Sequence, residues 1–336
     1  MTPKVMIILG SGSDIAIAEK SMDILEKLEI PYSLKIASAH RTPDLVRDLV
    51  KKGTDAGIEV FIGIAGLAAH LPGVMAGYTS KPVIGVPVDV KTGGQDALQS
   101  SVQMPYPSPV ATVGIDRGDN GAILAAQIIG LSDDEIRQKV IELRKEYSDK
   151  VINSNEDICQ KIEREFIRND FLRVKNIEIE DDVEADGETE DVDVTIIAGR
   201  HSDLIIAKKA GVILERLNIT YKIKVICPIR SNNKFRNFVK SHENSKIFIG
   251  ISSNSSQVTG ALVGLTDRPI IGVPCINELG NNYLLTLVNM PPGVPVGSVG
   301  INSGRNAAIL AAEILAIEDT SITELLAKIK SKKLNL

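Results

Sequence analysis

Short apolar runs alternate with amphipathic stretches along the chain, which is the pattern of strands and helices that take turns. Ile15–Leu28 and Asp44–Lys52 carry apolar residues at helical spacing between such runs. This alternation predicts βαβ units, and therefore a parallel sheet covered by helices on both faces. In the first part of the chain the predicted strands are Val5–Leu9, Leu34–Ala37, Val60–Ala65, Val83–Val86 and Val110–Gly114.

The same pattern occurs twice. Residues 5–30 (VMIILGSGSDIAIAEKSMDILEKLEI) match residues 194–219 (VTIIAGRHSDLIIAKKAGVILERLNI) at an offset of 189. Three further pairs follow in the same order, KPVIGVP with RPIIGVP, VQMP with VNMP, and AILAAQII with AILAAEIL. A repeated unit of roughly 130 residues is too long for a solenoid and indicates a duplicated domain. We predict an α/β protein with two tandem copies of a three-layer αβα domain, each with a flavodoxin-like or Rossmann-like parallel sheet.

The predicted boundaries are residues 1–131 for the first copy, 132–191 for a connecting region and 192–336 for the second copy. The connecting region begins with DDEIRQKVIELRKEYSDKVI, which predicts a helix capped near Asp133, and helical sequence continues to about Asn169. The run from Glu178 to Asp193 then holds ten acidic residues and no basic one. Such a composition is typical of a solvated spacer.

Composition excludes several classes of function. The formal net charge is −5, and without the acidic run the remainder would be close to balanced, at about +5. Aromatic residues make up only 4% and tryptophan is absent, which argues against a stacking surface for single-stranded nucleic acid. We therefore predict neither a nucleic-acid partner nor a membrane partner.

The cysteines and the apolar runs indicate a compartment. The three cysteines are scattered without a CxxC pair, which fits a reducing environment. No basic region followed by a long apolar core opens the chain, and the apolar run Val60–Val74 is too short to span a membrane and contains His70. We therefore expect a cytoplasmic protein.

Three polar segments of the first copy follow predicted strands, where ligands bind in sheets of this kind. The first is GSGSD, residues 10–14. Its glycines permit a tight turn, Ser11, Ser13 and the free N–H groups of the following helix suit a phosphate, and Asp14 could accept hydrogen bonds from sugar hydroxyls. The alternative is that Ser13 or Asp14 only caps the helix.

The second segment is SAHRTP, residues 38–43, in which Thr42 is a good N-cap and Pro43 suits the first helical position. Ser38, Ala39, His40 and Arg41 are then placed on the turn before the helix. Arg41 could bind phosphate with its planar fork, and His40 could transfer a proton near neutral pH. The alternative for His40 is a structural histidine.

The third segment is AGLAAHLPG, residues 65–73. Small residues here let the backbone approach a planar ligand, and His70 is either a second polar contact or a core histidine; the small residues are Ala65, Gly66, Ala68 and Ala69. A metal site is not expected, because clusters of histidine, cysteine and carboxylate at ligand spacing are absent from the sequence.

The second copy has lost both imidazoles. Ile229 stands where the first copy has His40, and Gln257 where it has His70, whereas Ser202, Asp203 and Arg230 are kept. Copy two thus retains groups that could hold a phosphate without those that could move a proton. It is then either a wall and scaffold for the working site or a nucleotide site of its own.

The motifs GSGSD, SAHRTP, AGLAAHLPG, KPVIGVPV, GGQDALQSSVQMP, PVATVGI and NGAILAAQI occur in order at their natural spacings. Together they resemble the PurE family of purine biosynthesis over most of residues 4–130, and residues 192–318 resemble it more weakly. The resemblance implies a three-layer αβα fold, action on aminoimidazole ribonucleotides and carbon dioxide, and no cofactor. Members of this family are octamers with sites at subunit junctions, so a chain of two copies implies a homotetramer.

The resemblance also assigns roles. It makes His40 the acid–base residue, and it matches His70 to the second histidine of the family's motifs. Ser11, Asp14, Ser38, Arg41 and the backbone of Ala65 and Gly66 would hold the ribonucleotide, with Ser13, Ala39 and Leu71 lining the site.

Two branches of that family differ in the carboxyl donor. The mutase branch moves a carboxylate from the exocyclic nitrogen of 5-(carboxyamino)imidazole ribonucleotide to ring carbon 4, and the carboxylase branch adds carbon dioxide to aminoimidazole ribonucleotide. SAHRTP with AAHLPG is similar to the mutase branch. Leu67, in place of a glycine, and MPYPSP at 104–109 depart from the family pattern. The donor therefore stays open here, as does a non-catalytic nucleotide sensor on the same fold.

Overall fold

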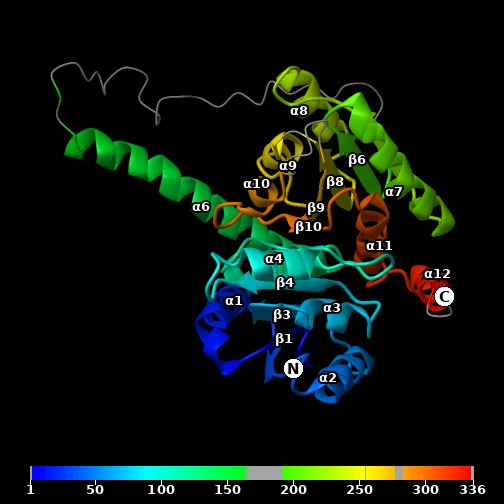
Figure 1. Ribbon diagram of the computed structural model, residues 1–336. Helices are drawn as coiled ribbons and strands as arrows, with labels where there is room; N and C mark the ends of the chain where they lie inside the picture. The colour runs from blue at the N-terminus through cyan, green and yellow to red at the C-terminus, as the bar shows by residue number, and fades with distance from the viewer. Residues whose placement is uncertain (1, 163, 165–190, 254, 277–282, 334–336) are drawn as a thin grey trace.

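The computed structural model describes residues 2–162, 164, 191–253, 255–276 and 283–333. Within these residues strands and helices alternate, and the strands form one ten-stranded sheet with helices packed on both faces (Figure 1). The strand order is β2-β1-β3-β4-β5-β10-β9-β8-β6-β7. The two copies therefore lie edge to edge in one shared sheet.

The first copy contains β1 (Val5–Leu9), the 3₁₀ turn η1 (Gly12–Asp14), α1 (Ile15–Lys27), β2 (Tyr32–Ile36), α2 (Pro43–Asp55), β3 (Val60–Gly66), α3 (Leu71–Ala76), β4 (Val83–Val88), α4 (Gln95–Val102), β5 (Ala111–Thr112) and α5 (Gly118–Ile129). The helix α6 (Asp134–Lys161) follows. The second copy contains β6 (Val194–Ala198), η3 (His201–Asp203), α7 (Leu204–Arg216), β7 (Tyr221–Val225), α8 (Asn232–Ser241), β8 (Ile247–Ser252), α9 (Gln257–Leu262), β9 (Ile270–Pro274), α10 (Leu284–Val288), β10 (Gly297–Ser298), α11 (Gly304–Leu315) and α12 (Thr320–Lys333).

The predicted parallel sheet is confirmed within each copy, and the junction of the two copies adds one antiparallel pair. Strands within each copy are parallel, but β5 pairs with β10 in antiparallel fashion, with Ser298 opposite Thr112. The edge strand β5 of the first copy meets the equivalent edge strand β10 of the second. A half-turn of one copy relative to the other is needed to bring equivalent edges together, and this half-turn reverses the direction of its strands. The last strand of the first copy is also shorter than the predicted Val110–Gly114.

Two buried asparagines join the copies reciprocally. The Asn120 side-chain amide donates to the carbonyl oxygens of Met290 and Pro291, at 3.3 and 3.0 Å. Its counterpart Asn306 donates to those of Met104 and Pro105, at 2.9 and 3.5 Å. Each copy thus donates hydrogen bonds to loop carbonyls of the other, and a buried hydrogen bond is costly to lose when one partner is left unsatisfied.

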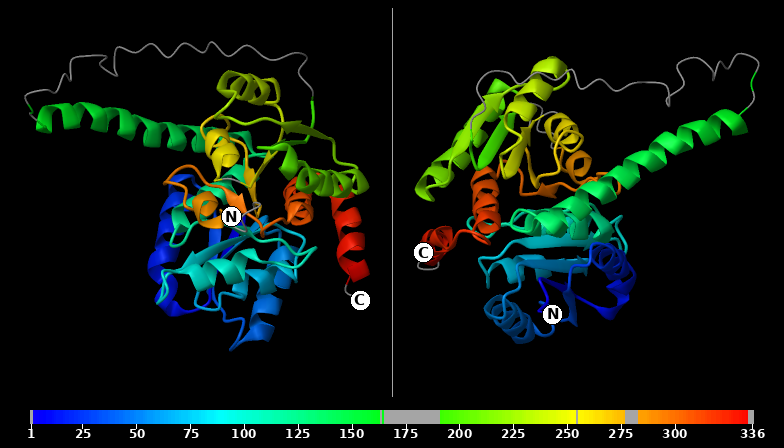
Figure 2. Two further views of the ribbon diagram at one scale, coloured as in Figure 1. Left: turned by 45° about the horizontal axis from the view of Figure 1, so that its top comes forward. Right: turned by 180° about the vertical axis from the view of Figure 1, so that it is seen from behind.

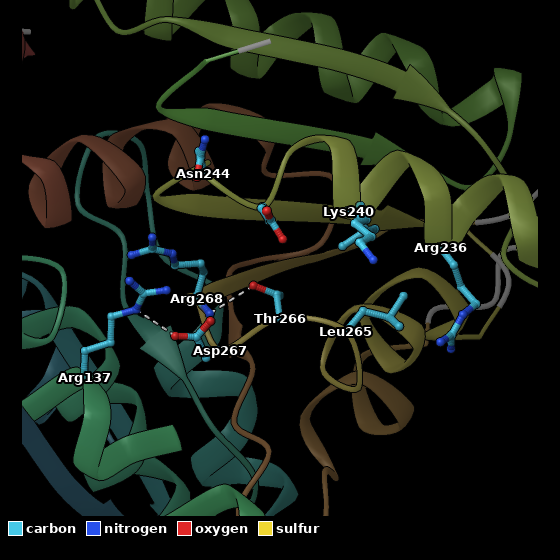
Figure 3. A pocket seen from close by; sticks show the side chains of 10 residues that line it. Arg137, Arg236, Lys240, Asn244, Leu265, Thr266, Asp267 and Arg268 are labelled. Atoms are coloured by element: carbon cyan, nitrogen blue, oxygen red, sulfur yellow. Dashed lines mark hydrogen bonds and ion pairs between the residues drawn. The ribbon is translucent and has the colours of Figure 1, made fainter. Parts of the chain in front are cut away.

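Helix α6 packs on both copies. Asp133 caps it as predicted, since its carboxylate accepts from the Ile136 N–H at 3.2 Å. Arg137 forms an ion pair of 2.9 Å with Asp267 of the second copy (Figure 3), and the Arg144 guanidinium donates to carbonyl oxygens of the same copy. The far half of α6 extends away from the body (Figure 2).

The helical part of the connecting region therefore belongs structurally to both copies. The acidic run 178–193 lies almost wholly outside the described residues, as does the predicted helical sequence beyond residue 164. Within the described ranges, none of the helices is long and apolar enough to cross a membrane.

A buried carboxyl group lies at the junction on the other side of the molecule. Glu313 of α11 is 1% exposed and forms an ion pair of 2.6 Å with Lys330 of α12, which also donates to the Thr79 carbonyl oxygen at 2.8 Å. Burial raises the pKa of Glu313 to about 7, although Lys330 acts in the opposite direction. At the equivalent place the first copy has a neutral amide, Gln127, which donates to the Asp267 carbonyl oxygen.

We predict that Glu313→Gln flattens the pH dependence of stability. The native pKa of about 7 exceeds the ordinary value of 4.5, so the native state binds the extra proton between these values. The unfolding free energy of the wild type should then fall as pH rises from 4.5 to 7, by at most about 3 kcal/mol from this group. Urea unfolding at pH 5 and pH 8 measures the difference. Glu324→Gln, at an exposed position of α12, is the control, and an unchanged pH slope in Glu313→Gln would contradict the prediction.

Helices α1 and α5 of the first copy, and α7 and α11 of the second, approach so closely that only glycine fits at each contact. A Cβ atom at Gly118 would lie 2.2 Å from the Ile17 carbonyl oxygen, and one at Gly304 would lie 2.3 Å from that of Ile206. Both contacts involve backbone atoms, which cannot move aside as a flexible side chain can.

Gly118→Ala and Gly304→Ala should therefore each lower the unfolding free energy, by about 1–3 kcal/mol or more. Gly260→Ala is the matched control, because an added Cβ there has nothing within 4 Å and alanine favours a helix by up to about 1 kcal/mol. Urea unfolding compares the three variants, and wild-type stability in Gly118→Ala would show that the helices can separate freely.

Candidate active site

The loops that follow β1, β2, β3 and β4 meet at the carboxyl edge of the first copy and enclose a hollow of about 500 Å³. Parallel strands bring these loops together, because all of their carboxyl ends lie on one edge. Apart from Ala69, the site residues predicted from the sequence line this hollow: Ser11, Ser13, Asp14, Ser38, Ala39, His40, Arg41, Ala65, Gly66, His70 and Leu71. Gly10, Leu67, Ala68 and Val90 complete the lining.

Asp14 lies at the base of the hollow and does not cap a helix. It occupies the N-cap position of α1 without a capping hydrogen bond, and Ser11 instead caps η1 by accepting from the Ser13 N–H. The capping alternative for Ser13 and Asp14 is therefore wrong. Asp14 is 5% exposed, and burial raises the pKa of its carboxyl group, although a hydrogen bond from the Ser13 hydroxyl lowers it. Its remaining acceptor capacity can be used by a ligand.

The SAHRTP loop is stiffened by its own side chains. Pro43 begins α2 and Thr42 lies at its N-cap, as predicted, but the Thr42 hydroxyl accepts from the Ser38 N–H at 2.9 Å and does not cap the helix. The Arg41 N–H donates to the Ser38 hydroxyl at 3.3 Å, and the Arg41 Nη2 donates to the Gly10 carbonyl oxygen at 3.2 Å. Arg41 therefore joins the first two loops at the mouth of the hollow.

Two imidazoles touch across the hollow. His40 Nε2 and His70 Nδ1 are 2.9 Å apart, and the ring planes meet at 74°. A contact of this length between two ring nitrogens contains one hydrogen, donated by one ring and accepted by the other. The pair can therefore pass a proton along, and both side chains are open to the hollow. The sequence placed these histidines on separate loops, and the structure brings them together.

The third loop has a backbone that glycine would normally adopt. Leu67 has φ of 55°, in the left-handed region, and its side chain is 48% exposed at the rim of the hollow. A non-glycine residue in this region costs about 1–2 kcal/mol, and such strain concentrates at functional sites. This explains why a glycine is expected there. Gly66 is required for a different reason, because a Cβ there would lie 2.4 Å from Val90 Cγ2.

Two expectations about the site need correction. Ala69 was expected among the small residues facing a ligand, but it is 1% exposed, packs in the core and does not line the hollow. Val90 lines the hollow and was missed, since its only signal is its position just after β4. All lining residues come from the first copy of the same chain, so a wall from a second copy would have to come from another chain, and that expectation stays a prediction. Within one chain the second copy cannot reach this edge, because its strands run in the opposite direction.

A further hollow of about 450 Å³ lies at the junction of the copies, near the amino ends of β8 and β9 (Figure 3). Arg137, Arg268 and Asp267 line it. The Arg137–Asp267 ion pair neutralises part of the positive charge of this lining. No imidazole lines it, so it offers no group for proton transfer at neutral pH. In the part of the chain that the structure describes, no group of three histidine, cysteine or carboxylate side chains could hold a metal ion.

The fold and the hollow define an α/β protein with a small-molecule pocket at the carboxyl edge of a parallel half-sheet. The chain belongs to the AIR carboxylase family, whose profile matches residues 4–150 and again residues 193–335. The resemblance predicted from the motifs is thereby confirmed, and so is the duplication. The exact domain boundaries 1–131, 132–191 and 192–336 stay a prediction.

Some relatives match the whole chain, and others match the length of a single copy. A Methanobrevibacter smithii protein called a probable N5-carboxyaminoimidazole ribonucleotide mutase is 69% identical over the whole of both chains. A Methanocaldococcus jannaschii protein called an N5-carboxyaminoimidazole ribonucleotide mutase is 55% identical over 154 residues, which are 46% of this chain and 96% of that protein. The crystal structure of Treponema denticola PurE aligns at 31% identity and a TM-score of 0.43, covering 48% of this chain and 99% of that one.

Proposed function

We propose that this chain is an N5-carboxyaminoimidazole ribonucleotide mutase of purine biosynthesis that works in the first copy. The observation that carries the proposal is the His40–His70 contact of 2.9 Å, in a hollow that also presents Arg41 and Asp14. The name of the full-length relative that is 69% identical supports the mutase over direct carboxylation as the reaction. We expect the reaction to take place in the cytoplasm and to require no cofactor.

The residues of the hollow divide between the two ends of a ribonucleotide. Arg41, with the hydroxyls of Ser11 and Ser38, lies where the phosphate would be bound. Asp14 would accept hydrogen bonds from ribose hydroxyls. The imidazole base would lie against the backbone of Ala65 and Gly66, which the absence of a side chain at Gly66 leaves open.

The reaction requires one proton to be given and one to be taken. Breaking the bond between the exocyclic nitrogen and the carboxylate releases carbon dioxide, and the nitrogen takes up a proton. Carbon 4 then attacks carbon dioxide, and loss of the carbon 4 proton restores the aromatic ring. His40 would donate the first proton and remove the second, with His70 as its partner, so the enzyme ends in its initial protonation state.

The apolar wall of the hollow would keep the released carbon dioxide beside carbon 4. Ala65, Ala68 and Val90 contribute to this wall. Holding both reactants in place makes the second step nearly intramolecular, which can lower its activation free energy by about 7–11 kcal/mol.

We predict that His40→Asn lowers kcat by about 10²–10⁴-fold, the usual contribution of a general acid–base group. Ribonucleotide affinity should stay within a few-fold of the wild type, because Arg41 and Asp14 are untouched. His70→Asn is the matched variant, and we expect a smaller loss of kcat because His70 acts through His40. Assays for carbon 4 carboxylation measure the effect, with isothermal titration calorimetry for binding.

The same assay tests the donor. The wild type should act on the carboxyamino ribonucleotide, and a second reaction holds aminoimidazole ribonucleotide with bicarbonate. Faster product formation in the second reaction would assign the carboxylase activity instead. If neither reaction gave product, the chain would be a non-catalytic nucleotide-binding protein. Near-normal turnover in His40→Asn would remove the acid–base role.

We also propose a homotetramer in which eight domains are arranged as in an octamer. Apolar side chains around the open hollow support a covering chain, since Ile36, Leu45 and Val90 are 56, 45 and 49% exposed. We expect light scattering at micromolar protein to give the mass of four chains. A monomer under these conditions would contradict the assembly without touching the catalytic assignment.

A further inference from the structure

The second copy has hollows of its own at the equivalent edge of its half-sheet. A larger one of about 830 Å³ and a smaller one of about 210 Å³ adjoin each other. Both are lined by Gly199, Arg200, Cys227 and Arg230, so they form one continuous depression, here called the second pocket.

The second pocket is more positively charged than the first. Its lining includes four cationic side chains and a single carboxylate, that of Asp203; the cations are Arg200, Lys224, Arg230 and Lys234. By the alignment of the copies, Arg200 stands in place of Ser11 and Lys234 in place of Leu45. Two cations have therefore been added where the first copy has none. Cations converging on one open depression favour a phosphate group as ligand.

Unsatisfied polar atoms lie deeper in the same pocket. Asp203 is 2% exposed and Ser252 is 4% exposed, and both line the smaller hollow. Asp203 Oδ2 and Ser252 Oγ have no hydrogen-bond partner among the described residues. Gly199 lines the pocket beside this carboxylate, and a Cβ added there would lie 3.8 Å from Asp203 Oδ2, an ordinary contact distance. Buried polar atoms without partners are unfavourable, and a ligand can satisfy them.

These deeper atoms decide which kind of anion fits. A carboxylate repels a bare phosphate ion but accepts a hydrogen bond from a hydroxyl group. The Ser252 hydroxyl can donate or accept. A ligand with a phosphate at one end and hydroxyl groups at the other matches both parts of the pocket.

The second pocket lacks the apparatus for proton transfer. Ile229 and Gln257 stand where the first copy has its two histidines, and Gln257 Oε1 instead accepts from the Cys227 thiol, whose Sγ is 3.9 Å away. His201 lines the larger hollow without a second imidazole. Binding without turnover is what these residues can perform.

We propose that the second copy binds a phosphorylated sugar, or the phosphorylated sugar portion of a nucleotide, and leaves it unchanged. The phosphate contacts Arg200, Arg230 and Lys234, and the sugar hydroxyls contact Asp203 and Ser252. This binding does not depend on the reaction proposed for the first copy, and each can fail without the other.

Isothermal titration calorimetry of the full chain with ribose 5-phosphate tests the proposal. We expect two sites per chain in the wild type. Arg230→Ala combined with Lys234→Ala should weaken one site at least tenfold and leave mutase activity intact, and Arg41→Ala should weaken the other. One site that disappears in Arg41→Ala and persists in the Arg230→Ala/Lys234→Ala variant would overturn the proposal.

Inorganic phosphate and ribose serve as the partial ligands. Equal affinity of the second pocket for phosphate and for ribose 5-phosphate would show that it holds an anion only, which contradicts the sugar assignment. Asp203→Asn should weaken ribose 5-phosphate binding and leave phosphate binding equal or tighter, because the carboxylate charge is removed. Unfolding midpoints of all variants verify that they are folded.

Cys227 provides an independent readout at the pocket wall. Burial raises the pKa of its thiol, but hydrogen bonds from the Arg230 and Ile229 backbone and from the Arg230 side chain outweigh it and leave the pKa lowered. Alkylation by iodoacetamide, located by peptide mass spectrometry, should be slowed at least fivefold by ribose 5-phosphate. No protection of Cys227 at concentrations that saturate the calorimetric sites would place the ligand elsewhere and overturn the assignment.

Discussion

The structure depends on one constraint, that the strands of each copy are parallel and buried on both faces. Parallel strands need crossover helices, and their carboxyl ends all lie on one edge, so four loops of the first copy converge there. That convergence alone brings His40 within 2.9 Å of His70, thirty residues further along the chain. The active site is therefore a consequence of strand direction before it is a consequence of any side chain.

The same constraint shapes the relation between the copies. Like edges meet at β5 and β10, the pairing there is antiparallel, and the two carboxyl edges face opposite ways in one sheet. Neither copy can contribute side chains to the pocket of the other within one chain. The junction is held instead by reciprocal contacts from Asn120 and Asn306, and by α6 and α12, which each cross to the other copy. What the duplication supplies to the first pocket within the chain is a stable edge to its sheet.

The two copies show how one backbone can support different chemistry. The loops after the first strand of each copy keep their 3₁₀ turn and a buried aspartate, Asp14 or Asp203. The first pocket pairs one arginine with two imidazoles, and the second has gained cations and lost the imidazoles. Because the loops are anchored by the sheet, such exchanges alter the charge of a pocket while its backbone framework is kept.

The sequence by itself determined the repeat, the βαβ order and most of the residues that line the first pocket. These properties follow from local periodicity and from residue types placed directly after apolar runs, as with His40 after Leu34–Ala37. Tertiary structure decided the rest. The antiparallel junction, the absence of the same chain's second copy from the pocket wall, the burial of Ala69 and the presence of Val90 in the lining all depend on contacts between distant segments. Periodicity indicates which face of a helix or strand is buried, but it does not indicate which segment packs against that face. The junction and the pocket lining depend on which segments pack together.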